Sequence, residues 1–357
     1  MTPELSAAAA LRLQLNALPG IGPVTARRLS EAFDGDLTRA LAASRDELLA
    51  IPGLGPVAVT TLLGPKLDPL AEYQHARRLG FNILTQGDPE WPEALNHLWD
   101  PPLVLYVEGA ALPVARAVAI VGTRRCTPYG AAMARNLATG LAQAGWWVVS
   151  GLAAGIDTAA HEGALEGGGP TAAVLGHGLE RTHPPTAHGL RRRIAATGCI
   201  LSEFPLGRVP DTRTFPQRNR LVAALCRAVV VIETDRAGGS HITARFASEL
   251  GRTVCAVPGR ADSPASRGCH DLIRDGATLI TQVDDILEEL GEAPTTARAP
   301  THAEIPELRP FNGGEAHDAE SLASLTEISV GEAAALLTRF EVEGHLRRRP
   351  DGRHERV

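Results

Sequence analysis

Short apolar runs alternate with longer stretches of helical periodicity from Ala117 to about Leu290. The runs are continuous rather than alternating in polarity, as is typical of strands buried on both faces. Helices between such strands predict a Rossmann-like α/β core with a doubly wound, mostly parallel sheet. The expected strands are Val118 to Val121, Trp146 to Val149, Ala172 to Leu175, Cys199 to Leu201, Val229 to Ile232, Val254 to Val257 and Thr278 to Ile280.

Residues 1–63 have a different pattern, in which short helices are separated by glycine and proline. The hairpin Leu18-Pro19-Gly20-Ile21-Gly22-Pro23 returns 33 residues later (53 − 20) as Ile51-Pro52-Gly53-Leu54-Gly55-Pro56. This repeat predicts a SAM-like helix-hairpin-helix domain. Its backbone N–H groups can face a phosphate, but a bundle whose glycines only shape the turns fits equally well. Only Arg27 and Arg28 lie near the first hairpin, and the second has no basic neighbour.

The remaining segments flank this core. The expected extended core spans residues 64–290. Its first part contains a helix at Pro69 to Leu79 and strands at Phe81 to Leu84 and Leu103 to Val107, ahead of the alternating strands and helices. Residues 291–317 are rich in Pro, Ala, Thr and Glu without periodicity, which indicates a flexible linker. Residues 318–357 combine short helices, a strand and an Asp-Gly turn, a pattern that predicts a small winged-helix-like domain.

Length and composition narrow the class of protein. A chain of 357 residues with 44% hydrophobic and 21% charged residues suggests two or three globular domains. We expect no membrane role, because no apolar run is long enough to span a bilayer, and cytoplasmic location, because the N-terminus lacks a secretory pattern. The 5 cysteines are widely spaced without a CxxC pair, so we expect reduced core thiols and no metal site.

The charge restricts where nucleic acid could bind. A net charge of -6 and a pI near 6.1 argue against a protein that coats DNA through its whole surface. A binding site must therefore be local. The segment Phe215-Pro216-Gln217-Arg218-Asn219-Arg220 supplies one ring and two guanidinium groups. A ring stacks on any base and guanidiniums pair with phosphates, so this segment predicts a site for a single nucleic-acid strand.

Loops that follow the strands are the next candidates, because ligands of open α/β sheets bind beyond the carboxyl ends of the strands. Gly122-Thr123-Arg124 can hold one phosphate, although no GxGxxG fingerprint is present and we expect no cofactor. Gly238-Gly239-Ser240 allows close backbone approach and offers amide and hydroxyl donors to an anion. We expect both loops and the Phe215 to Arg220 segment to meet at one sheet edge.

A further candidate is the pair Asp157 and His161, four residues apart at an expected helix start. The two could form an acid/base pair or the corner of a metal site. We favour a structural cap and its hydrogen-bond partner, because aspartate is expected at a helix N-terminus on capping grounds alone.

The order of these motifs resembles that of the DNA-processing protein DprA (Smf) family. Two more motifs complete the series, Ser202-Glu203-Phe204-Pro205-Leu206-Gly207 and Val257-Pro258-Gly259, and the resemblance covers about Phe81 to Leu290. Three positions depart from the family pattern. Ala154 replaces a common arginine, Ala237-Gly238-Gly239-Ser240-His241 stands where Ser-Gly-Ser-Leu is typical, and His270 replaces asparagine.

The resemblance implies a single-stranded DNA-binding protein without catalytic turnover. Such a protein forms homodimers through its core and hands DNA to a RecA-type recombinase in natural transformation or recombinational repair. By the same resemblance Arg124 holds a phosphate and Phe215 stacks on a base. The remaining implied site residues line the pocket, brace it or form the anion-binding turn: Gly122, Thr123, Arg218, Asn219, Arg220, Gly238, Gly239 and Ser240. Arg213 joins them on charge grounds alone.

Two rival functions remain. One is a nucleotide or phosphoribosyl hydrolase of the lysine-decarboxylase-like group, with Glu233 and Asp235 as candidate carboxylates. The sequence from Gly238 to Arg245 lacks the second Gly-Thr pair and the glutamate that those enzymes use, so we disfavour this alternative. The other is a protein that binds double-stranded DNA through the terminal modules, with Arg347 to Arg349 as the contact, although such an edge is more often only solvated.

Overall fold

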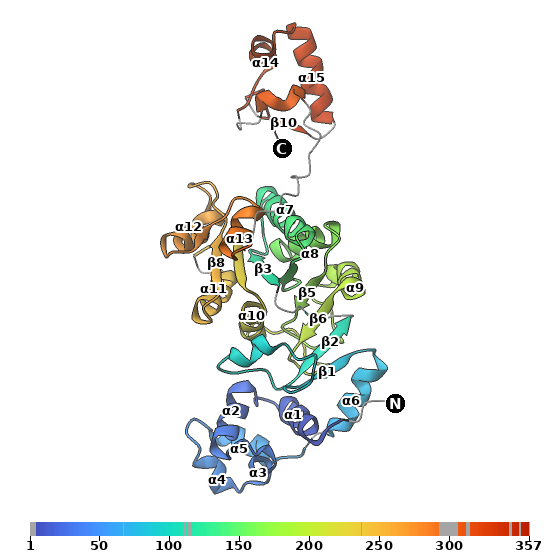
Figure 1. Ribbon diagram of the computed structural model, residues 1–357, viewed down its shortest axis with the longest axis vertical. Helices are drawn as coiled ribbons and strands as arrows, with labels where there is room; N and C mark the ends of the chain where they lie inside the picture. The colour runs from blue at the N-terminus through green and yellow to red at the C-terminus, as the bar shows by residue number, and fades with distance from the viewer. Residues whose placement is uncertain are drawn as a thin grey trace. The chain divides into compact units, whose positions relative to one another are not determined.

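The computed structural model describes residues 5–66, 68–109, 112, 116–236, 238–292, 306–311, 315–342, 345–349 and 351–356. The chain divides into two compact units, residues 1–294 and residues 295–357 (Figure 1). Most of the expected linker, residues 293–305 and 312–314, lies outside the described residues, as does Ala237 in the glycine-rich loop.

The first unit is built on a sheet of nine strands in the order β1-β2-β6-β5-β4-β3-β7-β8-β9, among the described residues. The seven strands from β3 to β9 pair in parallel, whereas β1 and β2 pair antiparallel at one edge. The prediction of a mostly parallel sheet is thus confirmed. The strands are β1 Asn82–Leu84, β2 Leu105–Gly109, β3 Ala117–Gly122, β4 Trp147–Ser150, β5 Thr171–Val174, β6 Cys199–Ser202, β7 Ala228–Ile232, β8 Thr253–Ala256 and β9 Thr278–Leu279.

Helices cover both faces of this sheet (Figure 1). Alternate residues of β3 enter different cores: Val118 and Ile120 pack on one face, Ala119 and Val121 on the other. The sequence run is apolar throughout because both faces need apolar side chains. One face carries α7 Pro128–Gln143, α8 Ile156–Glu166, α9 His188–Thr197 and α13 Val283–Glu289, and the other carries α10 Thr214–Ala224, α11 Gly239–Glu249 and α12 Arg267–Arg274.

The direction of winding reverses between β3 and β7. From β3 the chain proceeds outward through β4, β5 and β6, and then returns to place β7 on the other side of β3. The connections that leave β3 and β7 therefore turn to opposite faces, which opens a crevice beyond the ends of these two strands. Gly122 ends β3 there, opposite Ile232 of β7.

The N-terminal module contains the predicted repeat. Its helices are α1 Ala7–Ala17, α2 Pro23–Ala32, α3 Leu37–Ala42, α4 Arg45–Leu49 and α5 Pro56–Leu63, and α6 Pro69–Arg78 follows them. Gly20 and Gly53 have nearly the same φ, 74° and 78°, so both hairpins turn alike. Leu29 and Val59 belong to the same apolar cluster as Tyr106 of β2 and Ile200 of β6, which joins the module to the sheet.

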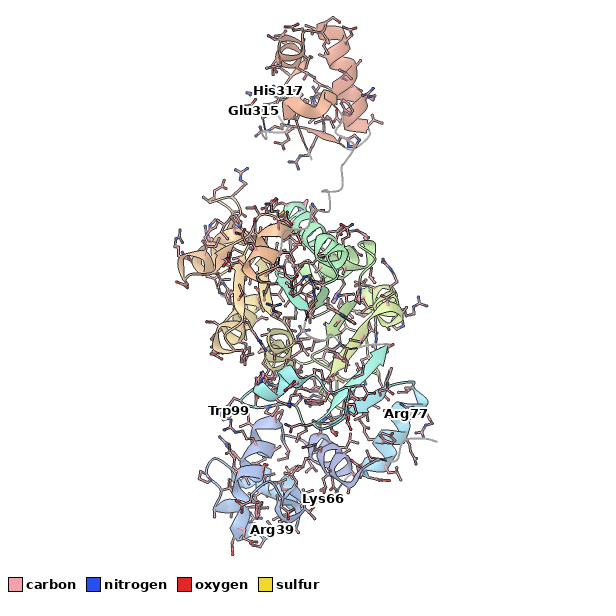
Figure 2. All side chains as sticks on the ribbon, viewed as in Figure 1. Arg39, Lys66, Arg77, Trp99, Glu315 and His317 are labelled. Atoms are coloured by element: carbon pink, nitrogen blue, oxygen red, sulfur yellow. The ribbon has the colours of Figure 1, made fainter. Side chains whose placement is uncertain are left out.

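Both arginines that the sequence offered as phosphate contacts of this module are engaged within the protein. Arg28 donates to the carbonyl oxygen of Gly53 at 2.6 Å and so links the two hairpins. Arg27 donates to Glu31 and lies over the ring of Trp99, with its Cζ atom 4.5 Å from the ring centroid (Figure 2). These contacts occupy both guanidinium groups and stabilise the module.

The second unit has its own core, which contains Leu322, Leu337, Phe340 and Leu346. Its elements are η4 Pro306–Phe311, α14 Ala319–Thr326, α15 Val330–Val342, and the antiparallel pair β10 Leu346–Arg348 and β11 His354–Arg356. Two helices followed by a hairpin agree with the expected order of elements; the winged-helix assignment itself stays a prediction. The linker prediction is wrong for residues 306–311, because Leu308 and Phe311 are buried in this core.

The cysteines behave as core residues. All 5 are free thiols, and Cys199, Cys226, Cys255 and Cys269 are buried. Burial disfavours the thiolate and raises the pKa of Cys255 to about 12 and that of Cys269 to about 11. The prediction of reduced core thiols is confirmed for these four.

The helices of the described residues are short. The longest, α7, has 16 residues, whereas a helix needs about 20 apolar residues to cross a bilayer. In the described ranges, no helix combines the length and the apolar character of a membrane span.

We expect Gly122→Ala to lower the free energy of unfolding by about 1 to 3 kcal/mol, the usual cost of forcing an atom into a packed core. A Cβ atom at this position would lie 1.8 Å from the carbonyl oxygen of Ile232 and would push β3 and β7 apart. Gly189→Ala is the control, because its Cβ atom would meet nothing within 4 Å inside helix α9. That variant should gain up to about 1 kcal/mol. Equal urea denaturation curves for both variants would contradict this account of the β3–β7 junction.

Candidate nucleic-acid interface

A crevice of about 480 Å³ lies beyond the ends of β3 and β7. It is lined by the loop after β3, the loop after β4, the start of α10 and the turn into α11. Nine of the residues predicted for the DNA site line this crevice: Gly122, Thr123, Arg124, Phe215, Arg218, Asn219, Gly238, Gly239 and Ser240. The topological switch point explains why segments so distant in sequence converge.

Arg124 and Phe215 meet in the centre of this crevice. The guanidinium carbon of exposed Arg124 lies 4.8 Å from the centroid of the half-buried Phe215 ring. The ring of His183 stacks against Phe215 as well, with centroids 6.1 Å apart and planes inclined by 30°. A cation and a flat ring at one point can receive a phosphate and the base attached to it.

The loop that carries Arg124 is held by the loop after β4. The backbone N–H of Ile156 donates to the carbonyl oxygen of Thr123 at 3.2 Å. Gly155, the residue before, has a φ of 82°, and a Cβ atom there would lie 2.4 Å from that same oxygen. Only glycine permits this approach without strain. The Ser-Gly-Leu-Ala-Ala-Gly motif therefore fixes the backbone of the Arg124 loop.

The turn into α11 forms the opposite wall. Gly238 is the N-cap residue and makes no side-chain cap hydrogen bond, so the helix start faces the crevice with backbone groups. A Cβ atom at Gly238 would lie 2.2 Å from Oγ1 of Thr234, which explains the glycine. The Ser240 hydroxyl is not available as predicted, because it donates to Oγ1 of Thr234 at 2.7 Å and the side chain is buried. Asn219 donates to the Gly239 carbonyl oxygen at 3.3 Å and ties α10 to this turn.

Arg218 braces the crevice from below. Its guanidinium donates to the carbonyl oxygen of Gly151 at 2.9 Å and also to that of Val174, at the ends of β4 and β5. The residue is only 6% exposed. A Cβ atom at Gly151 would collide with the guanidinium, so a larger residue at that position would displace Arg218 from these carbonyl groups. Because Phe215 and Arg218 are three residues apart on α10, they lie on the same face of this helix.

Arg220 does not line the crevice, so of the two roles implied for it, lining the pocket or bracing it, only bracing agrees with its position. Two residues along a helix correspond to a rotation of about 200°, so Arg220 points away from Arg218. Its guanidinium pairs with Glu203 at 2.6 Å and with Asp100 at 3.1 Å, and all three side chains are mostly buried. Arg220 therefore anchors α10 to β6 and to the loop that precedes β2.

Arg213 also lies outside the crevice lining, which corrects the prediction made from charge. Its side chain is 84% exposed and pairs with Asp211 at 2.9 Å. Hydrogen bonds from Arg213 lower the pKa of Asp211 to about 2, so the carboxylate stays charged and offsets the arginine. The positive charge of Arg213 is thus compensated locally.

Asp157 and His161 are structural residues, but they are not partners of each other. Asp157 accepts a hydrogen bond from the backbone of Ala153 at 3.3 Å, and Nδ1 of His161 contacts Oγ1 of Thr171 at 2.7 Å. Burial, together with the nearby positive Arg218, lowers the pKa of His161 to about 3, so the ring is neutral. In the part of the chain that is described, no three His, Cys, Asp or Glu side chains are arranged to hold a metal.

Of the two candidate carboxylates of the rival hydrolase, only Asp235 lines the crevice. Glu233 is buried and accepts hydrogen bonds from the backbone N–H and the hydroxyl of Thr127, the N-cap residue of α7. Asp235 lines the crevice, and its Oδ1 accepts from the backbone of Arg236 at 2.8 Å. Glu233 thus caps α7 instead of facing a substrate.

The structure adds residues that the sequence did not single out. Arg125 and Thr212 line the crevice, and His183 joins Phe215 in a smaller adjoining cavity of about 200 Å³. Arg125 directly follows Arg124 and could have been included on charge grounds. His183 comes from the loop after β5, which has no motif that would indicate its position.

Comparison with known proteins places this site in a family. The family model of DNA recombination-mediator protein A matches residues 82–291, which include the whole crevice. The chain belongs to the DNA recombination-mediator protein A family. This result confirms the resemblance drawn from the motifs. A model of the SAM-like helix-hairpin-helix tandem matches residues 13–63 and confirms the N-terminal module.

Individual relatives agree with the family match. Protein Smf from Synechocystis is 36% identical over 285 residues, which are 77% of this chain and 71% of that protein. The structure of DNA processing protein A (DprA) from Streptococcus pneumoniae matches 80% of this chain and 99% of that chain, with a TM-score of 0.66 and 31% identity. DNA processing protein A from Helicobacter pylori, whose structure describes its single-stranded DNA binding mode, matches 59% of this chain and 95% of that chain, with a TM-score of 0.53 and 33% identity.

His161 should make the stability of the protein depend on pH in a defined direction. The pKa of this ring is about 3 in the folded protein but near 6.5 when unfolded, so the unfolded state binds the extra proton between these values. The free energy of unfolding should fall by about 1.4 kcal/mol per pH unit below about pH 6 through this residue alone. Urea denaturation of the parent and His161→Gln from pH 7 to pH 4 measures the difference. Parallel pH profiles would contradict the assignment of a buried neutral ring.

Proposed function

We propose that the protein binds single-stranded DNA in the crevice at the β3–β7 switch point, without catalytic turnover. Arg124 pairs with a phosphate, and the base of that nucleotide stacks on Phe215. The turn at Gly238 and Gly239 directs the start of α11 toward a neighbouring phosphate. Arg218 and Asn219 hold these elements in place and make no direct contact with the DNA backbone.

The observation that carries this proposal is the contact between Arg124 and Phe215. The 4.8 Å approach joins an exposed cation to a half-buried ring at the point where α/β sheets bind ligands. The guanidinium lies over the ring, so a base that stacks on Phe215 takes the place of Arg124 when Arg124 turns to the phosphate. The single-stranded DNA binding mode described for the Helicobacter relative supports the same choice of ligand.

The family description supports a role in recombination. We propose that the protein acts as a homodimer in the cytoplasm and hands single-stranded DNA to a RecA-type recombinase, in DNA processing for transformation or in repair. The net charge of -6 fits a transient carrier, because a protein that is negative overall does not hold DNA through its whole surface. The terminal modules are further candidates for contact with double-stranded DNA. Two arginines of the C-terminal run, Arg347 and Arg349, already pair with Glu355.

The hydrolase alternative is tested directly. Incubation of the pure protein with nucleoside monophosphates should release no base above the buffer control, because Glu233 is engaged as the cap of α7. Base release that is lost in Asp235→Asn would replace the binding function by an enzymatic one.

Phe215→Ala should weaken the binding of oligothymidylate by about 1 to 3 kcal/mol, the usual contribution of one stacked base. The slope of log K against log salt should stay the same, because no charge is removed. Phe215→Tyr keeps the ring and serves as the matched control. Fluorescence anisotropy at several salt concentrations measures both quantities, and parental affinity in Phe215→Ala would show that the ring does not stack on a base.

Arg124→Ala should flatten the slope of log K against log salt by roughly 0.7, the value for one phosphate contact on a single strand. Arg124→Lys keeps the positive charge and should restore most of that slope. The same anisotropy titrations distinguish the two variants. If Arg124→Ala keeps the parental slope, Arg124 does not contact a phosphate.

A further inference from the structure

A groove of about 910 Å³ runs between helices α8 and α9, next to the proposed DNA site. Its floor is formed by small residues, among them Gly155, Ala187 and Gly189, and its rim carries Arg192 and Arg193. Both arginines are exposed, and the described residues give neither side chain an ion pair or hydrogen bond. The groove therefore combines open space with two uncompensated positive charges.

The groove is continuous with the crevice. The crevice shares Arg124, Phe215 and Arg218 with the small cavity beside His183. That cavity in turn shares Ala154 and Pro184 with the α8–α9 groove. Ala154 is exposed and has only a methyl side chain, so nothing large separates the two spaces. A chain molecule bound at Phe215 can thus extend into the groove without a break.

The sequence of α9 explains why the two arginines face outward. Arg191 points inward, where it pairs with Glu108 at 2.5 Å and donates to the carbonyl oxygen of Leu179 at 2.6 Å. This buried arginine fixes α9 against β2 and against the loop that carries His183. Arg192 and Arg193 are the next two residues and lie on the groove side of the same helix.

In other directions out of the crevice, several arginines pair with carboxylates. Toward α11, Arg245 pairs with Glu249 at 3.4 Å. Toward the first hairpin, Arg220 pairs with Glu203, and Arg208 lies 3.8 Å from Asp211. The acidic residue that lines the α8–α9 groove is Glu162, which shares Arg135 with Glu166. Along α9 a polyanion therefore meets two exposed arginines that are not engaged by carboxylates of the described residues.

We propose that single-stranded DNA leaves the crevice along the groove between α8 and α9, where Arg192 and Arg193 pair with two of its phosphates. This inference rests on the proposed function and adds to it a direction for the strand and a second contact site. The bases pass over Ala154, and the backbone follows the arginine rim of α9.

The test compares short and long oligothymidylates in the full-length protein. A strand of about 5 nucleotides fills only the crevice, and one of about 15 also reaches the groove, within the range of known single-strand sites. The double variant Arg192→Ala/Arg193→Ala should bind the short strand like the parent. For the long strand, the double variant should flatten the slope of log K against log salt by about 1.4, because two phosphate contacts are lost and each contributes roughly 0.7. The ratio of the parent's affinity for the long strand to that of the double variant should then shrink about sevenfold between about 50 and 200 mM salt.

Two controls separate charge and position. Arg77→Ala/Arg78→Ala removes the same charge from another pair of adjacent exposed arginines, at the end of α6 and outside these cavities (Figure 2). This variant should bind both strands like the parent. Arg192→Lys/Arg193→Lys should restore the slope for the long strand, because it keeps both charges.

The outcomes distinguish this inference from the proposed function. If the double alanine variant keeps the parental slope of log K against log salt on the long strand while Arg124→Ala flattens it, the strand does not follow the groove. The proposed binding site in the crevice is then unaffected. An equal loss in Arg77→Ala/Arg78→Ala also overturns the inference, because the effect is then one of net charge. If the parent binds neither strand, both proposals fail.

Discussion

One buried arginine organises the site. The guanidinium of Arg218 reaches past Gly151 to carbonyl oxygens at the ends of β4 and β5, and so fixes α10 against the sheet. Removal of a buried guanidinium from such partners leaves carbonyl groups without hydrogen bonds, which is costly. The position of Phe215, one turn earlier on α10, depends on this contact. The ring, its cation and the turn into α11 then meet where the winding of the sheet reverses.

The crevice concentrates positive charge in a protein that is negative overall. Some arginines near the sheet ends are engaged by carboxylates, as Arg220 is by Glu203 and Arg213 by Asp211. Arg124 instead stacks on an aromatic ring, so its charge remains available to a phosphate. This distribution favours a narrow path for one strand over general adhesion to DNA. The small residues of the site, such as Gly155 and Gly238, let backbone groups approach that path closely.

The sequence predicted the sheet well because burial on both faces imposes continuous apolar runs. Each expected strand occurs within two residues of its predicted bounds, and the strand-end loops gather as the switch-point rule requires. The errors have a common physical origin. Arg220 and Ser240 have suitable chemistry, but their partners Glu203 and Thr234 are brought near them by the fold. Arg213 is engaged by Asp211, a neighbour two residues away that the charge argument did not consider. The helical period alone would have separated Arg220 from Arg218.

A crystal structure of the protein with a short oligothymidylate tests the central claim most directly. The account predicts a phosphate oxygen at about 2.7 to 3.2 Å from the Arg124 guanidinium and a thymine stacked on the ring of Phe215. Arg218 should keep its hydrogen bonds to Gly151 and Val174 in that complex. A strand bound on another surface, with Arg124 still lying over Phe215 in an empty crevice, would contradict the account.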